Sequence, residues 1–185
     1  MSLEHLAELG RTAARCATEL EGPVRQYALL VRDTLASGRT VFFAGNGGSA
    51  AHAQHIATEY VVRYRPVARR AAAALALSTD SSLLTAAAND LGFEAVFARQ
   101  VEALGRQGDL LVLVSTSGDS PDLLRAAEAA RGAGVRTVGL LAKGGGRLAA
   151  LVDHAVIVPV DDTALAQEIQ LAIDHFVCAM VEPTL

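Results

Sequence analysis

Asp109-Leu-Leu-Val-Leu-Val114 is followed directly by Ser115-Thr-Ser-Gly-Asp-Ser120 and by Pro121. The first six residues are almost continuously apolar, which is typical of a strand covered on both faces. Hydroxyl side chains and a glycine then interrupt the apolar run, and Pro121 suits the first turn of a helix. The stretch therefore predicts a buried strand, a short polar loop and a helix.

The same order of elements occurs earlier in the chain. Residues 39–44 are a short apolar run rich in β-formers, Gly45-Asn-Gly-Gly-Ser49 is a tight glycine loop, and residues 49–64 have a helical pattern. Further strands are predicted at 71–77, 135–141 and 155–160. Helices are predicted at 3–37 with a break at Gly22-Pro23, and at 80–88, 93–104, 121–132, 147–151 and 163–181.

Strands that alternate with helices predict an α/β fold, a three-layer, doubly wound and roughly five-stranded parallel sheet flanked by helices. The chain has neither a linker nor a low-complexity tract, so its 185 residues predict a single domain over 1–185. Within it, a helical segment over 1–37 precedes an α/β core over 38–185. Ligands of such folds bind beyond the carboxyl ends of the strands, where both polar loops are expected to lie.

Composition narrows the class of protein. The chain is 51% hydrophobic but only 4% aromatic, which suits helices packed on a sheet through small side chains and excludes a disordered chain. A net charge of −4 argues against nucleic acid as a partner. No apolar run approaches the roughly 20 residues of a membrane span, and the N-terminus lacks the form of a signal peptide, so we expect a cytoplasmic protein. Cys16 and Cys178 are then expected to be separate buried thiols rather than a disulfide.

Both polar loops are suited to bind a phosphate group. Glycines let backbone N–H groups approach an anion, and a helix N-terminus adds unpaired donors and the positive end of a dipole. Four hydroxyl side chains in the second loop could complete the site: Ser115, Thr116, Ser117 and Ser120. Neither loop matches the dinucleotide fingerprint or the P-loop, so we expect a small phosphorylated ligand rather than a nucleotide. The alternative is that each loop is only a turn with a capping serine.

Two helices carry groups that could act in catalysis. His55 and Glu59 are four residues apart and so share one face of the helix after the first loop. The last helix adds polar residues within an otherwise apolar stretch: Gln167, Glu168, Gln170, Asp174 and His175. These side chains include acceptable zinc ligands, but no close-spaced cluster demands a metal. From spacing alone, an ordinary hydrogen bond on a helix surface is the favoured explanation for His55 and Glu59, and a metal site is only a weak hypothesis.

Four motifs follow one another along the chain. They are Gly45-Asn46-Gly47-Gly48-Ser49-Ala50 with His55 and Glu59, Thr85-Ala-Ala-Ala-Asn89-Asp90, Ser115-Thr116-Ser117-Gly118-x-Ser120, and Gln167-Glu168 with His175. Together they closely resemble the sedoheptulose-7-phosphate (phosphoheptose) isomerases of the sugar isomerase (SIS) domain superfamily. The resemblance covers nearly the whole chain, and four ordered motifs are far more specific than any one of them.

The resemblance implies an aldose–ketose isomerase. This family interconverts D-sedoheptulose 7-phosphate and D-glycero-D-manno-heptose 7-phosphate through an enediol intermediate, the first step of nucleotide-activated heptose biosynthesis. The resemblance further implies one zinc ion per subunit, no nucleotide cofactor, and a homotetramer with sites at subunit contacts. Neither nucleic acid nor a membrane is expected as a partner.

By position, the resemblance assigns roles to individual residues. Glu59 and His175 are implied as the acid/base pair. The implied zinc ligands are His55, Glu59, Gln167 and His175. The implied substrate contacts are Asn46, Gly47, Gly48, Ser49, Glu59, Asn89, Asp90 and Gln167, with Ser115, Thr116, Ser117 and Ser120 around the phosphate. A zinc-bound carboxylate has a lowered pKa and is a weaker base, so the two roles implied for Glu59 conflict.

Three features depart from the family pattern. Asp119 stands where asparagine is common, and we expect its carboxylate to point away from the phosphate. Gln170 replaces a frequent histidine. The stretch 63–70 is shortened and altered, which leaves open any substrate contact of Arg63 or Arg65.

Helix geometry bears on the assembly. Gln167 and His175 are eight residues apart, or about 12 Å along a straight helix. They therefore either straddle the site, or one of them comes from a neighbouring subunit.

Two other functions remain open from the sequence. One is a non-catalytic SIS-domain binding protein that resembles a replication initiator-associating factor, and the other is a phosphosugar-sensing domain with a silent site. The chain keeps His55, Glu59 and His175 together, which a purely binding protein has no reason to do. This combination favours the isomerase.

Overall fold

A parallel β-sheet forms the centre of the molecule. The computed structural model describes residues 3–66 and 68–185, so the first two residues of the predicted domain and position 67 of the altered stretch lie outside the described residues. Five strands run in the order β2-β1-β3-β4-β5, and every neighbouring pair is parallel. Their bounds are β1 Val41–Gly45, β2 Ala74–Ala76, β3 Leu110–Ser115, β4 Arg136–Ala142 and β5 His154–Val158. The predicted five-stranded parallel sheet is confirmed.

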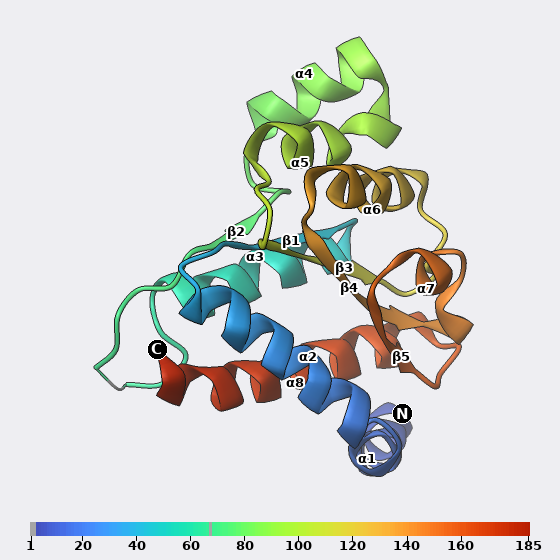
Figure 1. The fold of residues 1–185 in the computed structure, drawn as a ribbon. Helices are drawn as coiled ribbons and strands as arrows, with labels where there is room; N and C mark the ends of the chain where they lie inside the picture. Colours follow the sequence, from blue (N-terminus) through green and yellow to red (C-terminus); the bar gives the residue numbers. More distant parts are fainter. Residues whose placement is uncertain (1–2, 67) are drawn as a thin grey trace.

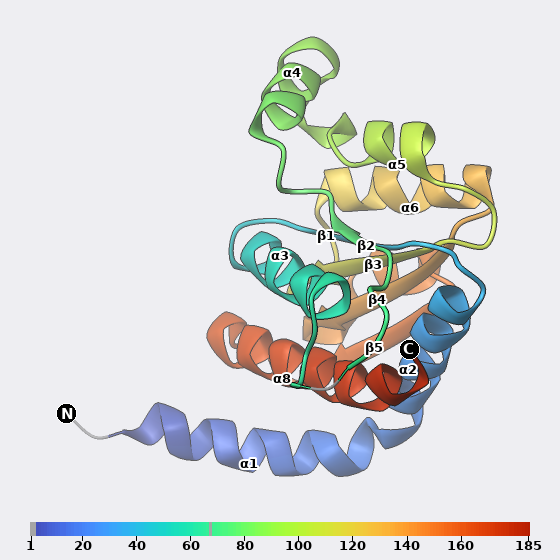
Figure 2. The ribbon, with the colours of Figure 1, turned by 90° about the vertical axis from the view of Figure 1, so that its left-hand side faces the viewer.

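Helices cover both faces of the sheet (Figures 1 and 2). One layer holds α2 (Glu21–Ala36), α3 (Gly48–Val61) and α8 (Thr163–Val181), and α1 (Glu4–Glu19) packs on the outside of α2 and α8 (Figure 2). The opposite layer holds α4 (Ser81–Leu91), α5 (Ala98–Leu104), α6 (Pro121–Ala133) and α7 (Leu148–Leu151), with the short 3-10 helix η1 (Phe93–Ala95). Two further 3-10 helices are η2 (Lys143–Gly145) and η3 (Glu182–Thr184).

Successive residues of each central strand point to opposite layers, which creates two hydrophobic cores. Val41 and Phe43 of β1 pack in the core shared by α2, α3 and α8, whereas Phe42 packs in the core under α5 and α6. All six residues of β3 are buried, as the continuous apolar run predicted. Cys16 and Cys178 are both buried and free, so the prediction of two separate thiols is confirmed.

Several predicted helix ends are wrong, and local chemistry explains two of them. The break in the first helical stretch lies at Leu20, and Gly22 and Pro23 belong to the first turn of α2, where a proline sacrifices no hydrogen bond. The helix predicted over 80–88 is capped at its start by the Asp80 side chain, which accepts from the Leu83 N–H at 2.9 Å, and it continues to Leu91, where Gly92 with a φ of +90° ends it. The helix predicted over 93–104 is divided into η1 and α5.

The last helix, α8, begins and ends as predicted. The Asp162 side chain caps its N-terminus by accepting from the Leu165 N–H at 2.8 Å. By length and composition, the span Thr163–Thr184 could cross a membrane, so the prediction that no run is long and apolar enough is wrong by this criterion. Half of that span's apolar window is buried, and it includes the fully buried Gln170 and Asp174. The helix packs against α2 and α3 as a core element of the fold (Figure 1).

Candidate active site

The two polar loops meet at the carboxyl edge of the sheet. Their strands, β1 and β3, are hydrogen-bonded neighbours, and Gly45 lies opposite Val114. The Asn46 Nδ2 donates to both carboxylate oxygens of Asp122, at 3.1 and 2.9 Å. Asp122 lies in the first turn of α6 and is only 2% exposed. The two loops therefore form one continuous site, as their predicted position at adjacent strand ends required.

The first loop has glycine where other chain segments come close. Gly47 has a φ of +53°, a conformation that side chains disfavour. A Cβ on Gly48 would lie 2.6 Å from the Gln167 Nε2, so this glycine lets α8 approach the start of α3. No side chain caps α3, which leaves the start of this helix suited to bind an anion. The structure thus brings predicted substrate residues of the first loop together with Gln167.

The second loop presents its hydroxyl groups at the start of α6. Ser115 is buried, and its Oγ accepts from the Gly118 N–H at 3.0 Å. The Ser117 Oγ accepts from the Asp119 N–H at 3.3 Å. Ser120 occupies the N-cap position of α6 without making a capping hydrogen bond, so its hydroxyl can turn to a ligand. Serine hydroxyls and a helix N-terminus together are well suited to a phosphate.

Asp119 is engaged by the neighbouring segment of chain. Its Oδ1 accepts from the Arg147 backbone N–H at 3.1 Å and from the Arg147 Nε at 3.0 Å. Hydrogen bonds from the backbone and side chain of Arg147 lower the pKa of this carboxyl. The contacts agree with the expectation that Asp119 points away from a bound phosphate.

Sequence reasoning missed the segment that supports the second loop. A Cβ on Gly118 would overlap the Gly145 carbonyl, and a Cβ on Gly146 would overlap the Ser117 carbonyl, so the two backbones are in direct contact. The supporting segment, residues 143–146, begins at Lys143, which has a φ of +50°. The Lys143 Nζ donates to the Thr163 Oγ1 at 3.0 Å. Three consecutive glycines at 144–146 were the available signal.

The candidate acid/base residues lie where α3 faces α8. The Nε2 atoms of His55 and His175 are 2.9 Å apart, and the Glu59 Oε1 lies 3.7 Å from the His55 Nε2. Burial, and then the neighbouring His55, lower the pKa of His175, so its imidazole is neutral near pH 7. The Glu59 side chain is 17% exposed, which leaves it within reach of a ligand. The structure therefore brings together all three residues that favoured an enzyme.

The Tyr64 side chain also lies at this site, although the sequence did not indicate that it would. Its ring stacks on the His175 ring, with centroids 5.5 Å apart and planes inclined by 26°. The Arg65 guanidinium lies 5.5 Å from the centre of the Tyr64 ring. Arg63 is exposed.

Three buried polar side chains, those of Tyr27, His52 and Asp174, lie together where α2, α3 and α8 meet. The Tyr27 hydroxyl donates to the Asp174 Oδ1 at 2.6 Å, and the His52 Nε2 lies 2.8 Å from the Asp174 Oδ2 without the angles of a hydrogen bond. Burial, and then the charge of Asp174, raise the pKa of Tyr27 well above its usual value. One turn earlier on α8, the Gln170 Nε2 donates to the carbonyls of Ser115 and Leu140 at 3.2 and 2.9 Å. Gln170 thus joins α8 to the strand that carries the second loop.

The structure does not bring every predicted site residue together. Asn89 and Asp90 are exposed on α4, where the Asn89 Nδ2 donates to the Asp90 Oδ1 at 2.7 Å. This helix lies on the opposite side of the sheet from α3 and α8 (Figure 2). Gln167 contacts Gly48, while His175 contacts His55. The two α8 residues therefore straddle the site within one chain.

The donor atoms at the α3–α8 contact suit a zinc ion in part. Across the described residues, no group of three or more His, Cys, Asp or Glu side chains meets the criteria of a metal site. Yet two imidazole nitrogens 2.9 Å apart, with a carboxylate oxygen 3.7 Å from one of them, are close to the ligand spacing of about 3.3 Å in a tetrahedral zinc site.

Comparisons with known proteins agree with this geometry. A family model described as "SIS domain" matches residues 4–142. A phosphoheptose isomerase of Nitratidesulfovibrio vulgaris is 48% identical over 180 residues, which cover 97% of this chain and 86% of that protein. The solved phosphoheptose isomerase structure from Neisseria gonorrhoeae has 38% identity and a TM-score of 0.91, and covers 97% of this chain and 96% of its own. The one from Francisella tularensis has 31% identity and a TM-score of 0.93, with 97% and 95% covered. This chain belongs to the SIS-domain proteins and, among them, to the phosphoheptose isomerase family.

Proposed function

We propose that this protein interconverts D-sedoheptulose 7-phosphate and D-glycero-D-manno-heptose 7-phosphate. The observation that carries the proposal is the convergence of Glu59, His55 and His175 from two helices beside the polar loops. Relatives of 44–52% identity are named phosphoheptose isomerases, which supports the same substrate here. A cytoplasmic location remains part of the proposal.

The polar loops supply the binding half of the proposed site. The phosphate binds at the start of α6, on Ser115, Thr116, Ser117 and Ser120. The sugar hydroxyls lie toward the first loop, on Asn46, Gly47, Gly48, Ser49 and Gln167. Because the Asn46 Nδ2 donates to Asp122, the side-chain amide is held in one orientation, and its Oδ1 is left to accept from a sugar hydroxyl.

Glu59 and His175 supply the chemical half. The Glu59 carboxylate removes a proton from C1 of the ketose, which yields an enediol between C1 and C2, and the proton then returns to C2 to give the aldose. Neutral His175 moves a proton between the oxygens on C1 and C2, because an unprotonated imidazole can both accept and donate. A carboxylate base and a neutral imidazole thus divide the carbon and oxygen proton transfers.

The proposal includes a zinc ion, held by His55, Glu59 and His175 with Gln167 as the implied fourth ligand. When bound, zinc would act as a Lewis acid that polarises the carbonyl and stabilises negative charge on the enediol oxygens. If the Glu59 carboxylate coordinates the ion, its pKa decreases and Glu59 becomes a weaker base. Removal of the metal with a chelator, followed by the isomerase assay, tests this part of the proposal.

A homotetramer is the proposed assembly, with sites at subunit contacts. The α1 helix reaches along the outside of the molecule with only Thr12 and Cys16 buried (Figure 2). A largely apolar groove of about 310 Å³ lies between α1, α2 and α8, where Phe176 is 43% exposed. A second copy would cover this face, and a neighbouring α4 could return Asn89 and Asp90 to a site. Light scattering that finds a stable, active monomer would contradict this assembly.

The function is tested by incubating the purified protein with sedoheptulose 7-phosphate and assaying for an aldose phosphate. An isomerase forms the aldose until equilibrium is reached. A phosphosugar-sensing domain would bind the ketose without converting it. A binding protein of the replication type would do neither.

A further inference from the structure

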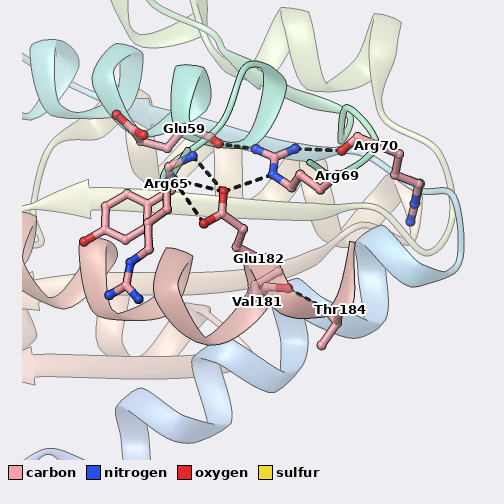
Figure 3. Close-up of polar contacts among 8 residues, drawn as sticks. Glu59, Arg65, Arg69, Arg70, Val181, Glu182 and Thr184 are labelled. Carbon is pink, nitrogen blue, oxygen red and sulfur yellow. Dashed lines mark hydrogen bonds and ion pairs between the residues drawn. The ribbon is translucent and has the colours of Figure 1, made fainter. Parts of the chain in front are cut away.

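Glu182 lies directly after α8 and is almost completely buried, with a side chain only 5% exposed. Its Oε1 accepts from the Tyr64 N–H at 2.9 Å, and both of its oxygens accept from the Arg65 N–H at 3.1 Å (Figure 3). The Arg69 Nε lies 3.2 Å from the Oε1 and donates to it. Burial opposes ionisation of this carboxyl, but these hydrogen bonds and the Arg69 charge outweigh it and lower the pKa of Glu182.

Arg69 is the buried partner, with a side chain 4% exposed. Its guanidinium donates in three directions: to Glu182, to the Arg70 carbonyl at 2.7 Å and to the carbonyl of Glu59 (Figure 3). A planar guanidinium holds its donors in fixed directions, which a lysine ammonium cannot do. Arg69 therefore ties the last turn of α3 to the end of α8.

This ion pair is connected to both proposed proton-transfer residues. On one side, Arg69 holds the backbone carbonyl of Glu59. On the other side, Glu182 holds the N–H of Tyr64, whose ring stacks on His175. Both side chains of the pair are buried, so neither is available to contact a substrate.

We propose that Arg69 and Glu182 are positioning residues for proton transfer, which fix Glu59 and His175 relative to each other. The inference rests on the proposed isomerase function. A buried ion pair contributes little net stability by itself, because desolvation opposes the attraction, whereas its hydrogen bonds define a geometry. Catalysis is sensitive to such geometry, since a displacement of about 1 Å can cost about 100-fold in rate.

The kinetic test uses two matched substitutions of neighbouring arginines. Arg69→Lys keeps a positive charge beside Glu182 but loses the separate bond to the Glu59 carbonyl. Arg70→Lys is the control, because the Arg70 Nη2 donates to the Leu35 carbonyl of α2 and not to Glu59. We expect Arg69→Lys and Glu182→Gln to lower kcat at least 10-fold with KM changed less than threefold, and Arg70→Lys to retain wild-type kcat. Equal kcat values for Arg69→Lys and Arg70→Lys, or a loss that falls on KM alone, would overturn the inference.

A second readout does not depend on turnover. Because the two rings are stacked, we expect the Tyr64 ring current to shift the NMR signals of the His175 ring protons, and we expect this shift to decrease in Glu182→Gln and Arg69→Lys but not in Arg70→Lys. Unchanged His175 resonances in folded Glu182→Gln would count against the positioning role, whatever the activity. A wild-type protein without isomerase activity would refute the proposed function, while the His175 resonances would still report on the link.

Discussion

The Nε2 atoms of His55 and His175 lie 2.9 Å apart, although 120 positions separate the two residues in the sequence. One proton can lie between them as a hydrogen bond, or one metal ion can bind both. The Glu59 Oε1 lies 3.7 Å from the His55 Nε2, so its carboxylate is the nearest acidic group to either a shared proton or a bound metal ion. The first prediction follows from this contact.

We expect the protein to bind about one zinc ion per subunit, and His55→Ala to weaken zinc binding at least about 100-fold, because an imidazole ligand is lost. Zinc titration against a competing chelator measures the affinity. His5→Ala is the control, since His5 lies on α1 and contacts Glu168. Equal zinc affinity of wild type and His55→Ala would show that the metal, if bound, is held elsewhere.

Asp122 should control substrate binding through Asn46. Asp122→Ala removes the acceptor of both Asn46 N–H···O contacts, so the amide can rotate and its Oδ1 is no longer directed at the sugar. We expect KM for sedoheptulose 7-phosphate to rise about tenfold, which corresponds to one lost hydrogen bond. Steady-state kinetics provide the check, with Asp33→Ala on α2 as the control. If both variants had the wild-type KM, the link between the two loops would have no role in binding.

Two buried tyrosines should respond oppositely to loss of their hydroxyls. Tyr27→Phe leaves the buried Asp174 carboxylate without its 2.6 Å donor and should lower the free energy of unfolding by about 1–3 kcal/mol. Tyr60→Phe removes a hydroxyl whose polar neighbour is the Cys178 thiol, a weak hydrogen-bond partner, and should cost nothing or stabilise the fold. Urea denaturation of both variants measures the difference. Equal destabilisation would contradict the assignment of the Tyr27 hydroxyl as the stabilising donor.

The stabilisation contributed by Glu182 should depend on pH. Its pKa is lowered in the folded state, so it binds a proton more readily when unfolded. The contribution is therefore fully present above the unfolded pKa of about 4.3 and is lost as pH falls through the folded pKa. We expect the difference in unfolding free energy between wild type and Glu182→Gln to be constant from pH 7 to 6 and to shrink below pH 4. A difference that stayed constant down to acid pH would contradict this assignment.

The sequence predicted the elements whose signals are local. Alternating strands and helices, the continuous apolar run of β3 and both ends of α8 could be predicted because a few consecutive residues determine each of them. The contact between the two polar loops followed from the parallel sheet. Both loops follow the carboxyl ends of parallel strands, so they had to lie at the same edge of the sheet, where ligands of such folds bind.

The parts that could not be predicted depend on residues distant in sequence. Helix α3 ends at Val61 rather than at Tyr64, where the backbone N–H is instead bonded to Glu182, 118 positions away. Strand β2 has only three residues, although the apolar pattern extended further. The stacking of Tyr64 on His175 had no motif to indicate it, since only the packing of the segment after α3 against α8 creates it.

The central claim is that Glu59 removes the proton from the substrate carbon. The most direct measurement is NMR of sedoheptulose 7-phosphate incubated with the protein in D₂O, which follows deuterium entering C2 of the aldose and C1 of the ketose. Wild type should exchange these protons, and Glu59→Gln should exchange them at least about 100-fold more slowly while still binding the sugar, as expected for loss of a general base. Exchange by Glu59→Gln at the wild-type rate would contradict the account.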